Sequence, residues 1–354
     1  MIKKILIIRL SSIGDVIHCT PVAKALKTAW PDCQITWLAG EVCADLVRYN
    51  PYVDECIVWS RERFEKCCRK YEFKEAWRMW QELMALFSDQ EFYAVLDIHG
   101  LFLTGLIASK IKAERRIGLK DARELNSFFM TETVKPNGRH MIKRYMSILE
   151  PLGIFANGDD MTLVIPDKEK KFAANFLRQA GVKAGDRLAV LVPGTTWPSK
   201  NWSPEFFAKT ASLIAGDFKS IICGGVSEIK IGREIESRIS GSLINAIGKT
   251  NLLEMASILE LASVVVAGDT GPLHMAAALK IPTVVIFGPS DPECYRPLGD
   301  TSIALFHKQE CSFCHKQNCP KGKSDCMKSV LPQEVAEAVY KLAGGSEPMA
   351  INVI

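Results

Sequence analysis

Short apolar segments alternate with amphipathic segments along most of the chain, and this alternation limits the fold more than any other feature. The apolar segments have the length of strands and the amphipathic ones that of helices, which is the pattern of repeated βαβ units. Such units form parallel sheets with helices on both faces. The predicted strands are residues 3–9, 34–38, 55–59, 94–98, 187–192, 220–223, 263–267 and 283–287.

Several of the expected helices have recognisable ends. The first is predicted over residues 21–29, with Thr20 as its N-cap and Pro21 in its first position, because proline is favoured where the backbone N–H has no helical partner. A long amphipathic stretch follows at residues 62–87. The other predicted helices are residues 204–214, 228–239, 252–261, 272–279 and 332–342.

The alternation weakens around residues 153–170, where only a short strand ending at Pro166 is expected. A chain of 354 residues favours two domains over one. We predict an N-terminal domain (residues 1–165), a C-terminal domain (166–330) and a terminal helix and tail (331–354). Two doubly wound domains in tandem should form a cleft at the carboxyl ends of their strands, where ligands of such sheets bind.

Composition excludes several classes of protein. Hydrophobic residues make up 48% of the chain and charged residues 24%, as in globular proteins, and the net charge of +4 does not indicate nucleic-acid binding. No apolar run approaches the roughly 20 residues that span a bilayer. The apolar N-terminus is short and Arg9 interrupts it, so a buried strand is favoured over a signal peptide. Twelve cysteines without an export signal then suggest reduced thiols in the cytoplasm.

Polar residues gather where the first predicted strand ends. The segment Arg9-Leu-Ser-Ser-Ile-Gly-Asp15 allows a sharp turn, and Ser12 and Gly14 are expected to line an acceptor site. Asp15 should lie at the carboxyl edge of the sheet, where a carboxylate can accept a proton from a substrate hydroxyl. The alternative is that Asp15 only caps the start of a helix.

A loop rich in hydroxyl groups follows the strand at 187–192. Lys200 offers a point charge to a phosphate, and Thr195 and Thr196 offer hydroxyl donors. The alternative is an ordinary solvent-facing lysine.

The sharpest motif is Asp269-Thr-Gly-Pro-Leu-His274, directly after the strand at 263–267. The free amides of Thr270 and Gly271 at a helix N-terminus, together with the helix dipole, suit an anion such as a diphosphate. Asp269 would repel a diphosphate and is therefore expected to face sugar hydroxyls. His274 either faces the same site or is a half-buried histidine satisfied within the protein.

Two weaker candidates lie between these loops. Glu228 follows the strand at 220–223 and can accept hydrogen bonds from a ribose, and Thr250 precedes a helix and can line a base pocket. Glycine-rich turns after strands are common in α/β proteins, so neither position is specific. The motifs G-x-G-x-x-G after the first strand and G-x-x-x-x-G-K-[ST] are absent, which disfavours a nicotinamide enzyme and a P-loop NTPase.

Four cysteines stand close together near the end of the chain: Cys311, Cys314, Cys319 and Cys326. Thiols at such spacing can hold zinc or an iron–sulfur cluster, although the spacing matches no standard motif closely. Free thiols or a surface disulfide are the alternatives. We expect no metal ion and no cofactor to take part in the chemistry.

Residues 110–144 carry an excess of positive charge. Arg115 and Arg116 are expected to contact an anionic acceptor, and the segment can also meet an anionic membrane surface. The alternative is a solvated helix face.

Three segments together resemble glycosyltransferase family 9, the ADP-heptose:lipopolysaccharide heptosyltransferases. They are Arg9-Leu-Ser-Ser-Ile-Gly-Asp-Val-Ile-His18, Pro193-Gly-Thr-Thr-Trp-Pro-Ser-Lys-Asn-Trp202 and the stretch from Gly268 through Phe287-Gly-Pro-Ser290. Many members also have a late cysteine-rich stretch like residues 311–327, so the resemblance covers nearly the whole chain. It implies a GT-B fold, in which two Rossmann-like domains face a central cleft, and an inverting, metal-independent transfer.

The resemblance also implies substrates and partners. Heptose is transferred from ADP-L-glycero-D-manno-heptose to the lipopolysaccharide inner core, either to Kdo of Kdo-lipid A or to a first heptose. The enzyme is expected to be cytoplasmic and peripheral on the inner membrane, with no nucleic-acid partner. Two alternatives stay open: a GT-B enzyme with another donor, such as a sugar-nucleotide epimerase, and a non-catalytic, metal-bearing module centred on the cysteines.

Residue roles follow from the same resemblance. Asp15 becomes the general base, Lys200 the phosphate ligand and Asp269 the residue that holds the heptose hydroxyls. Thr270 and Gly271 bind the diphosphate. Glu228 and Thr250 fall where the family binds ribose and adenine.

Overall fold

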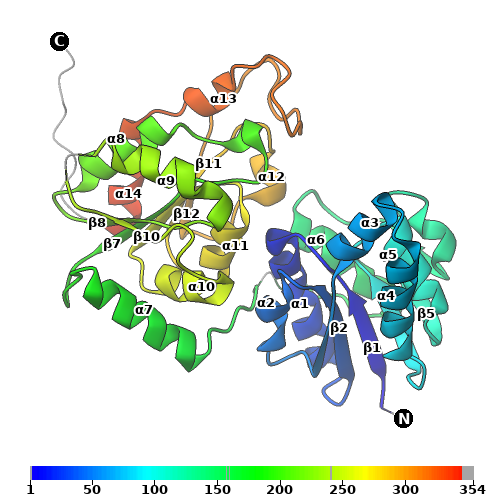
Figure 1. The fold of residues 1–354 in the computed structure, drawn as a ribbon. Coiled ribbons are helices and arrows are strands. Elements are labelled where there is room, and N and C mark those ends of the chain that lie inside the picture. The colour runs from blue at the N-terminus through cyan, green and yellow to red at the C-terminus, as the bar shows by residue number, and fades with distance from the viewer. Residues whose placement is uncertain (1, 157, 159, 240, 345–354) are drawn as a thin grey trace. The chain divides into compact units, whose positions relative to one another are not determined.

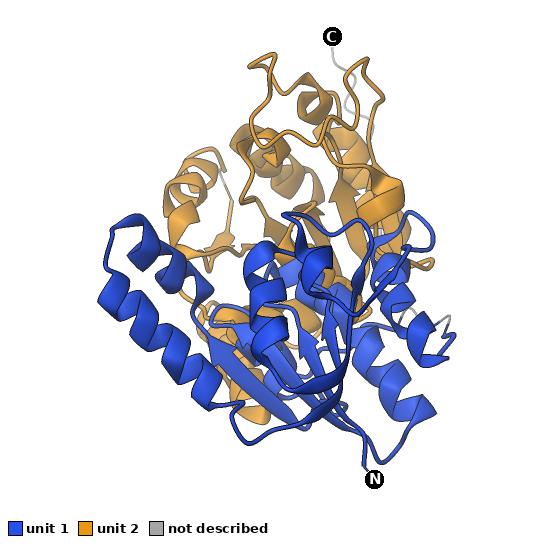
Figure 2. Cartoon of the chain, turned by 90° about the vertical axis from the view of Figure 1, so that its right-hand side faces the viewer, with its two compact units in different colours: residues 1–164 blue, residues 165–354 orange. Residues whose placement is uncertain are grey.

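The computed structural model of this chain describes residues 2–156, 158, 160–239 and 241–344. The chain divides into two compact units, residues 1–164 and residues 165–354 (Figure 2). Each unit is built around its own parallel sheet (Figure 1). The last ten residues of the predicted terminal segment 331–354 lie outside the described residues.

Unit 1 contains a six-stranded sheet in the order β3-β2-β1-β4-β5-β6, and all neighbouring strands run parallel. Leu6 and Ile8 of β1 pack in one core cluster with residues of α4 and α5. Ile5 and Ile7 point to the opposite face and are equally buried, so both faces of the sheet are covered. The strands are β1 (Lys4–Ile8), β2 (Gln34–Gly40), β3 (Glu55–Trp59), β4 (Phe92–Asp97), β5 (Ala113–Leu119) and β6 (Glu132–Val134). The helices are α1 (Ile13–Ala29), α2 (Ala44–Arg48), α3 (Arg61–Arg69), α4 (Phe73–Ala85), α5 (Phe102–Lys110) and α6 (Met141–Met146), with 3-10 turns η1 (Asn126–Phe129) and η2 (Ser147–Leu152).

Unit 2 repeats this topology in the order β12-β11-β10-β7-β8-β9. Trp202 and Phe207 pack with α14 over one face of its sheet. The strands are β7 (Leu188–Val192), β8 (Lys219–Ile222), β9 (Leu243–Asn245), β10 (Val264–Gly268), β11 (Thr283–Ile286) and β12 (Ser302–Leu305). The helices are α7 (Asp167–Gln179), α8 (Pro204–Ile214), α9 (Ile229–Glu236), α10 (Leu252–Glu260), α11 (Gly271–Ala278), α12 (Pro292–Tyr295), α13 (Asp325–Lys328) and α14 (Pro332–Ala343), with 3-10 turns η3 (Pro198–Lys200) and η4 (Val226–Glu228).

Both sheets therefore have the strand order of a Rossmann fold, and the predicted fold class of two doubly wound parallel sheets is confirmed. In each sheet the order reverses at the innermost pair, β1 and β4 in unit 1 and β7 and β10 in unit 2. Ligands of such sheets bind beside the carboxyl ends of these strands. The predicted site segments after residues 8, 192 and 268 all lie at these two points.

The predicted start of the first helix is wrong. Helix α1 begins at Ile13 with Ser12 as N-cap, and it continues through Pro21 to Ala29. An interior proline leaves the carbonyl four residues earlier without its amide partner. Here the Thr20 hydroxyl donates to that carbonyl, of Ile17, at 2.7 Å, which offsets part of the cost.

Other predictions fail for local reasons. The stretch 62–87 forms two helices, because Tyr71 has a φ of 60° and a left-handed residue ends a right-handed helix. The short strand expected to end at Pro166 is not present in residues 160–166, where the Thr162 amide donates to Thr20 Oγ1 and not to a neighbouring strand. The sequence patterns did not indicate strands β5, β6, β9 and β12 or helices α2, α5, α6, α7, α12 and α13.

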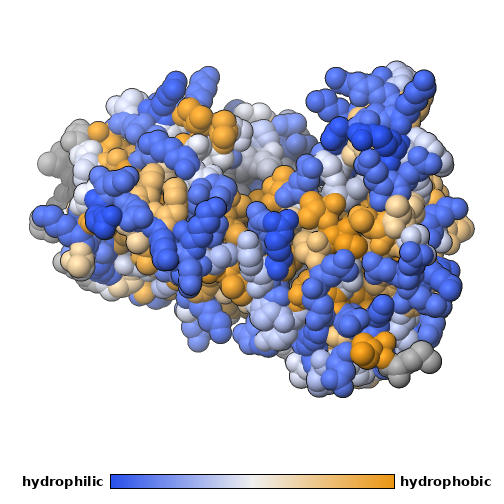
Figure 3. Space-filling view, turned by 60° about the horizontal axis from the view of Figure 1, so that its bottom comes forward, coloured by the Kyte–Doolittle hydropathy of each residue, from blue (hydrophilic) through white to orange (hydrophobic). Residues whose placement is uncertain are grey.

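The face of the molecule in Figure 3 shows hydrophobic residues scattered among hydrophilic ones. None of the helices in the described ranges is long and apolar enough to cross a membrane.

Candidate active site

Asp15 lies in the first turn of α1, at the carboxyl edge of β1. Arg9 Nη2 lies 2.6 Å from Asp15 Oδ2, and the Ser12 hydroxyl donates to the same oxygen at 2.9 Å. The Tyr145 hydroxyl, from α6, donates to Oδ1 at 2.6 Å. Asp15 also caps the helix start, as the alternative interpretation held, because its Oδ2 accepts a hydrogen bond from the Ser12 amide at 3.5 Å. In addition, Arg9 and the distant Tyr145 bind the carboxylate.

These partners keep the Asp15 carboxylate ionised. Burial alone raises the pKa of Asp15, but the charge of Arg9 and the hydrogen bond from Tyr145 outweigh it and hold the pKa well below its usual range. The side chain is 27% exposed, so a substrate can reach it. Arg9 is buried and is fixed by a further hydrogen bond from Nη1 to the Ile98 carbonyl at 2.9 Å.

The end of β4, next to β1, adds polar residues that were missed in the sequence. The buried Asp97 carboxylate accepts hydrogen bonds from the backbone amides of His99 and Gly100 and from Asn126 Nδ2, and so fixes the loop after the strand. Arg61 Nη1 lies 2.8 Å from His99 Nε2. Burial and the charges of Arg9 and Arg61 lower the pKa of His99 to about 3, so the ring is neutral. The sequence Asp-Ile-His-Gly at the end of the predicted strand 94–98 is the signal that points to this loop.

The basic segment is not a solvated helix, because it contains β5 and β6. Arg115 binds Glu132 of β6 through Nε at 2.7 Å and Nη2 at 2.6 Å, and Nη2 also donates to the Pro151 carbonyl. Arg116 Nε donates to the Phe129 carbonyl at 3.2 Å. Both guanidinium groups therefore have structural partners within unit 1, and their contact with an acceptor stays a prediction.

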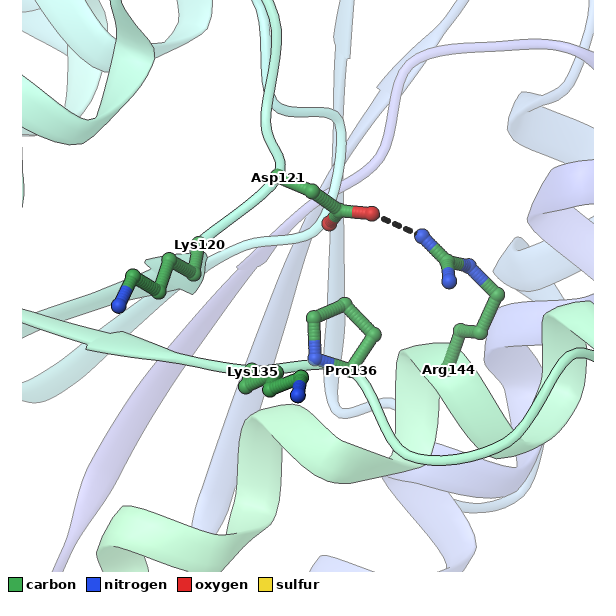
Figure 4. Close-up of a pocket in the computed structure, with 5 residues that line it drawn as sticks. All are labelled: Lys120, Asp121, Lys135, Pro136 and Arg144. Carbon is green, nitrogen blue, oxygen red and sulfur yellow. Dashed lines mark hydrogen bonds and ion pairs between the residues drawn. The ribbon is translucent and has the colours of Figure 1, made fainter.

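Other basic side chains surround a pocket of about 380 Å³ near the ends of β5 and β6 (Figure 4). Arg144 of α6 forms an ion pair with Asp121, which follows β5. Tyr145, the next residue of α6, contacts Asp15. Helix α6 therefore contributes one residue to this pocket and the next residue to the surroundings of the Asp15 carboxylate. The pocket is lined by Lys120, Asp121, Lys135, Pro136 and Arg144.

In unit 2 the Lys200 amine is paired with Asp269. Lys200 ends the short turn η3, and its Nζ lies 2.6 Å from Asp269 Oδ2 and 4.6 Å from the centre of the Trp197 ring. Both side chains are largely buried. The predicted phosphate ligand and the predicted sugar ligand therefore bind each other in this structure, a pairing that the sequence did not indicate.

The motif after β10 has the expected form. Helix α11 begins at Gly271 with Thr270 as N-cap and Pro272 in its first turn. His274 Nε2 lies 3.3 Å from Asp269 Oδ1 and is almost fully buried. Burial raises the pKa of Asp269, but the hydrogen bond with His274 and the charge of Lys200 outweigh this and lower it.

The remaining predicted donor ligands also lie at the carboxyl edge of this sheet. Thr195 Oγ1 is 2.7 Å from both the Trp197 carbonyl and Asn201 Oδ1, and Thr196 is exposed. Thr250 Oγ1 is buried and has no hydrogen-bond partner among the described residues, so a ligand can supply one.

Glu228 is enclosed by glycines. Its Oε2 accepts a hydrogen bond from the Gly225 amide, and burial raises its pKa. A Cβ atom at Gly224 would lie 2.6 Å from Oε2, and one at Gly194 would lie 2.6 Å from Oε1. The loops after β7 and β8 thus need glycine to make room for this carboxylate.

We therefore expect Gly194→Ala to displace Glu228 and to lower the free energy of unfolding by about 1–3 kcal/mol, the usual cost of overpacking. Gly216→Ala is the control, because a Cβ atom there meets nothing within 4 Å. Denaturant unfolding of both variants measures the difference, and equal stabilities would contradict this account of the loops.

The cysteine cluster has no metal-binding geometry. All four cysteines are free thiols, and no group of three or more His, Cys, Asp or Glu side chains within the described ranges could hold a metal ion. Burial and the neighbouring thiols raise the pKa of Cys326, whereas hydrogen bonds from backbone amides lower that of Cys319. The disulfide alternative is therefore excluded for this structure.

A family model, glycosyltransferase family 9 (heptosyltransferase), matches residues 76–324. The chain is a family 9 glycosyltransferase. Lys200, Glu228 and Asp269 lie within the matched range, whereas Asp15 precedes it.

Relatives of this glycosyltransferase extend over both units. Lipopolysaccharide heptosyltransferase 1 of Pseudomonas aeruginosa is 26% identical over 324 residues, which cover 89% of this chain and 87% of the relative. The crystal structure of a family 9 glycosyltransferase from Veillonella parvula superimposes with a TM-score of 0.81 at 24% identity, covering 96% of this chain and 97% of that one. An E. coli heptosyltransferase solved with ADP-2-deoxy-2-fluoro heptose gives a TM-score of 0.71 at 21% identity, covering 96% and 99%.

Proposed function

We propose that this glycosyltransferase moves L-glycero-D-manno-heptose from ADP-heptose to the inner core of lipopolysaccharide, onto Kdo or a first heptose. The observation that carries the proposal is that the chain has both a candidate general base and a candidate site for the leaving diphosphate. Unit 1 has an ionised, partly exposed carboxylate at Asp15, and unit 2 has the cation of Lys200 beside the helix N-terminus at Gly271. The relatives named above support the choice of sugar and acceptor.

The donor site belongs to unit 2. The amides of Thr270 and Gly271 and the dipole of α11 bind the diphosphate, as helix N-termini bind phosphates generally. Lys200 is the phosphate ligand, and it leaves Asp269 when the diphosphate arrives. Asp269 is then available to the heptose hydroxyls while His274 still holds its second oxygen. Glu228 binds the ribose, Thr250 lines the base pocket, and Thr195 and Thr196 add hydroxyl donors.

The acceptor site belongs to unit 1. Asp15 takes the proton of the acceptor hydroxyl, whose oxygen attacks the anomeric carbon as the bond to the diphosphate breaks. An inverting transfer needs this base on the face opposite the leaving group. Lys200 and the N-terminus of α11 stabilise the departing ADP, so the transfer does not depend on a metal ion. Ser12, Gly14, Arg115 and Arg116 complete the acceptor site.

We also propose that the enzyme is cytoplasmic and works as a peripheral protein on the inner membrane. The support is the acceptor, a lipid-anchored glycan, together with the excess of positive charge in residues 110–144. Sedimentation with vesicles that contain anionic lipid tests this part, and no binding at low salt would contradict it.

A donor panel tests the proposed function as a whole. ADP and ADP-heptose are expected to raise the melting temperature, because a ligand that binds only the folded state stabilises it. UDP and UDP-sugars are the matched controls and should have little effect. Heptose transfer to a heptose-free core acceptor should follow, detected by a mass increase of the product.

Stabilisation by UDP-sugars without ADP would indicate another GT-B enzyme, either a transferase with a different donor or a sugar-nucleotide epimerase. Stabilisation by ADP-heptose with no product from any core acceptor would contradict the proposal that the lipopolysaccharide core is the acceptor.

A further inference from the structure

The two oxygens of Asp15 have different surroundings. Oδ2 accepts hydrogen bonds from Arg9 Nη2 at 2.6 Å and from the Ser12 hydroxyl at 2.9 Å, and a longer one from the Ser12 amide at 3.5 Å. Oδ1 accepts one, from the Tyr145 hydroxyl at 2.6 Å, among the described residues. An ionised carboxylate has about four lone-pair positions, two on each oxygen. Oδ2 is therefore saturated, and the free position is on Oδ1.

We propose that Oδ1 of Asp15 is the oxygen that takes the acceptor proton, and that Tyr145 is a positioning residue that fixes this oxygen. This inference rests on the proposed function, in which Asp15 is the general base. The proton passes from the acceptor hydroxyl to Oδ1, the acceptor oxygen bonds to the anomeric carbon, and the electron pair of the breaking carbon–oxygen bond leaves with ADP.

Packing makes Tyr145 a rigid support. Its side chain is buried, the Arg9 guanidinium lies 5.1 Å from its ring centre, and α6 packs along α1. The Arg9 guanidinium is fixed in turn by the Ile98 carbonyl. The carboxylate is thus held from both sides, and rotation about its Cβ–Cγ bond would break bonds to Tyr145 and Arg9 together.

The same arrangement limits the basicity of Oδ1. A phenol that donates to the reacting oxygen withdraws electron density from it, so a stronger donor makes a weaker base. Tyr145 therefore fixes the orientation of Oδ1 but makes it less basic. Removal of the hydroxyl loses the orientation and restores the basicity, whereas a more acidic hydroxyl keeps the orientation and lowers the basicity further. The two effects can therefore be measured separately.

The test uses the full-length enzyme with ADP-heptose and a heptose-free core acceptor. Tyr145→Phe is expected to lower kcat about tenfold to a hundredfold, because a charge-assisted hydrogen bond that orients the base is lost. The Kd for ADP should not change, since the proposed donor ligands belong to unit 2. Tyr340→Phe, at a buried tyrosine of α14, is the matched control and should retain the wild-type kcat.

A second series does not depend on the folding of the Phe variant. Mono- and difluorotyrosine at position 145 keep the ring and the hydroxyl, and they increase the acidity of the phenol. They should lower kcat in steps while the Kd for ADP stays constant. A Tyr145→Phe variant with wild-type kcat, or a kcat independent of fluorination, would overturn the inference.

The outcomes separate this inference from the proposed function. If Asp15→Asn is inactive but the Tyr145 variants are fully active, Asp15 remains the proposed general base and the positioning role proposed for Tyr145 is wrong. If Asp15→Asn is active, the proposed base itself is wrong.

Discussion

Asp15→Asn is expected to lower kcat for heptosyl transfer by about 10²- to 10⁴-fold, the usual contribution of a general base. Asparagine has the same size as aspartate but cannot accept the proton of the acceptor hydroxyl. The proposed ADP ligands all belong to unit 2, so the Kd for ADP should stay within about twofold of the wild-type value, well under the 1.4 kcal/mol of a tenfold change. Steady-state kinetics and calorimetric titration with ADP measure the two quantities.

The variant will also lose stability, because the buried Arg9 guanidinium loses its counter-charge. Removing a hydrogen bond to a charged group costs about 1.5–3 kcal/mol. The kinetics therefore need a temperature well below the melting point of the variant. Asp45→Asn is the control, since Asp45 forms an ion pair with Arg48 that is about half exposed. A kcat within threefold of wild type for Asp15→Asn would exclude Asp15 as the base.

Lys200→Met should have the second-largest effect, and it acts in two ways. It removes the cation proposed to stabilise the departing diphosphate, which should lower kcat/KM about 10²- to 10³-fold. It also leaves the Asp269 carboxylate buried without its amine, and breaking such a pair costs about 3 kcal/mol of folding stability. Kinetics and denaturant unfolding measure the two losses separately.

A double variant distinguishes these two roles. Lys200→Met with Asp269→Asn leaves no unpaired buried charge, so it should recover much of the lost stability while it stays inactive. Lys209→Met, at an exposed lysine of α8, is the control and should match the wild type in both assays. If Lys200→Met binds and turns over ADP-heptose normally, Lys200 is not a donor ligand.

Much of the fold could be predicted from the sequence where periodicity and burial agree. The innermost strands β1, β7 and β10 are continuous apolar runs because both of their faces are covered, and apolar runs of that length are readily identified. Strand β5 was missed because Glu114, Arg115 and Arg116 occupy its first half. Those charges are tolerated because Arg115 binds Glu132 of the next strand, a contact between residues far apart in the sequence.

In the candidate site, too, some features could be predicted from the sequence and others depend on contacts between distant residues. Its positions could be predicted, because Asp15, Lys200 and Asp269 follow strands at the carboxyl edges of their sheets. Their partners could not, since spacing does not show that Tyr145 reaches Asp15 or that Lys200 binds Asp269. The prediction of a helix start at Pro21 is wrong because Thr20, a residue type typical of an N-cap, instead donates to the Ile17 carbonyl inside the helix.

The helix that carries Asp15 also holds the chain shortly before the end of unit 1. The Thr20 hydroxyl of α1 accepts a hydrogen bond from the Thr162 amide, and α7 begins at Asp167. Only residues 163–166 lie between these two fixed points. Within them Leu163 and Ile165 are buried, and Pro166 restricts both itself and the residue before it. The segment that connects the two units is therefore very short, and one of its ends is anchored to the helix that carries the proposed base.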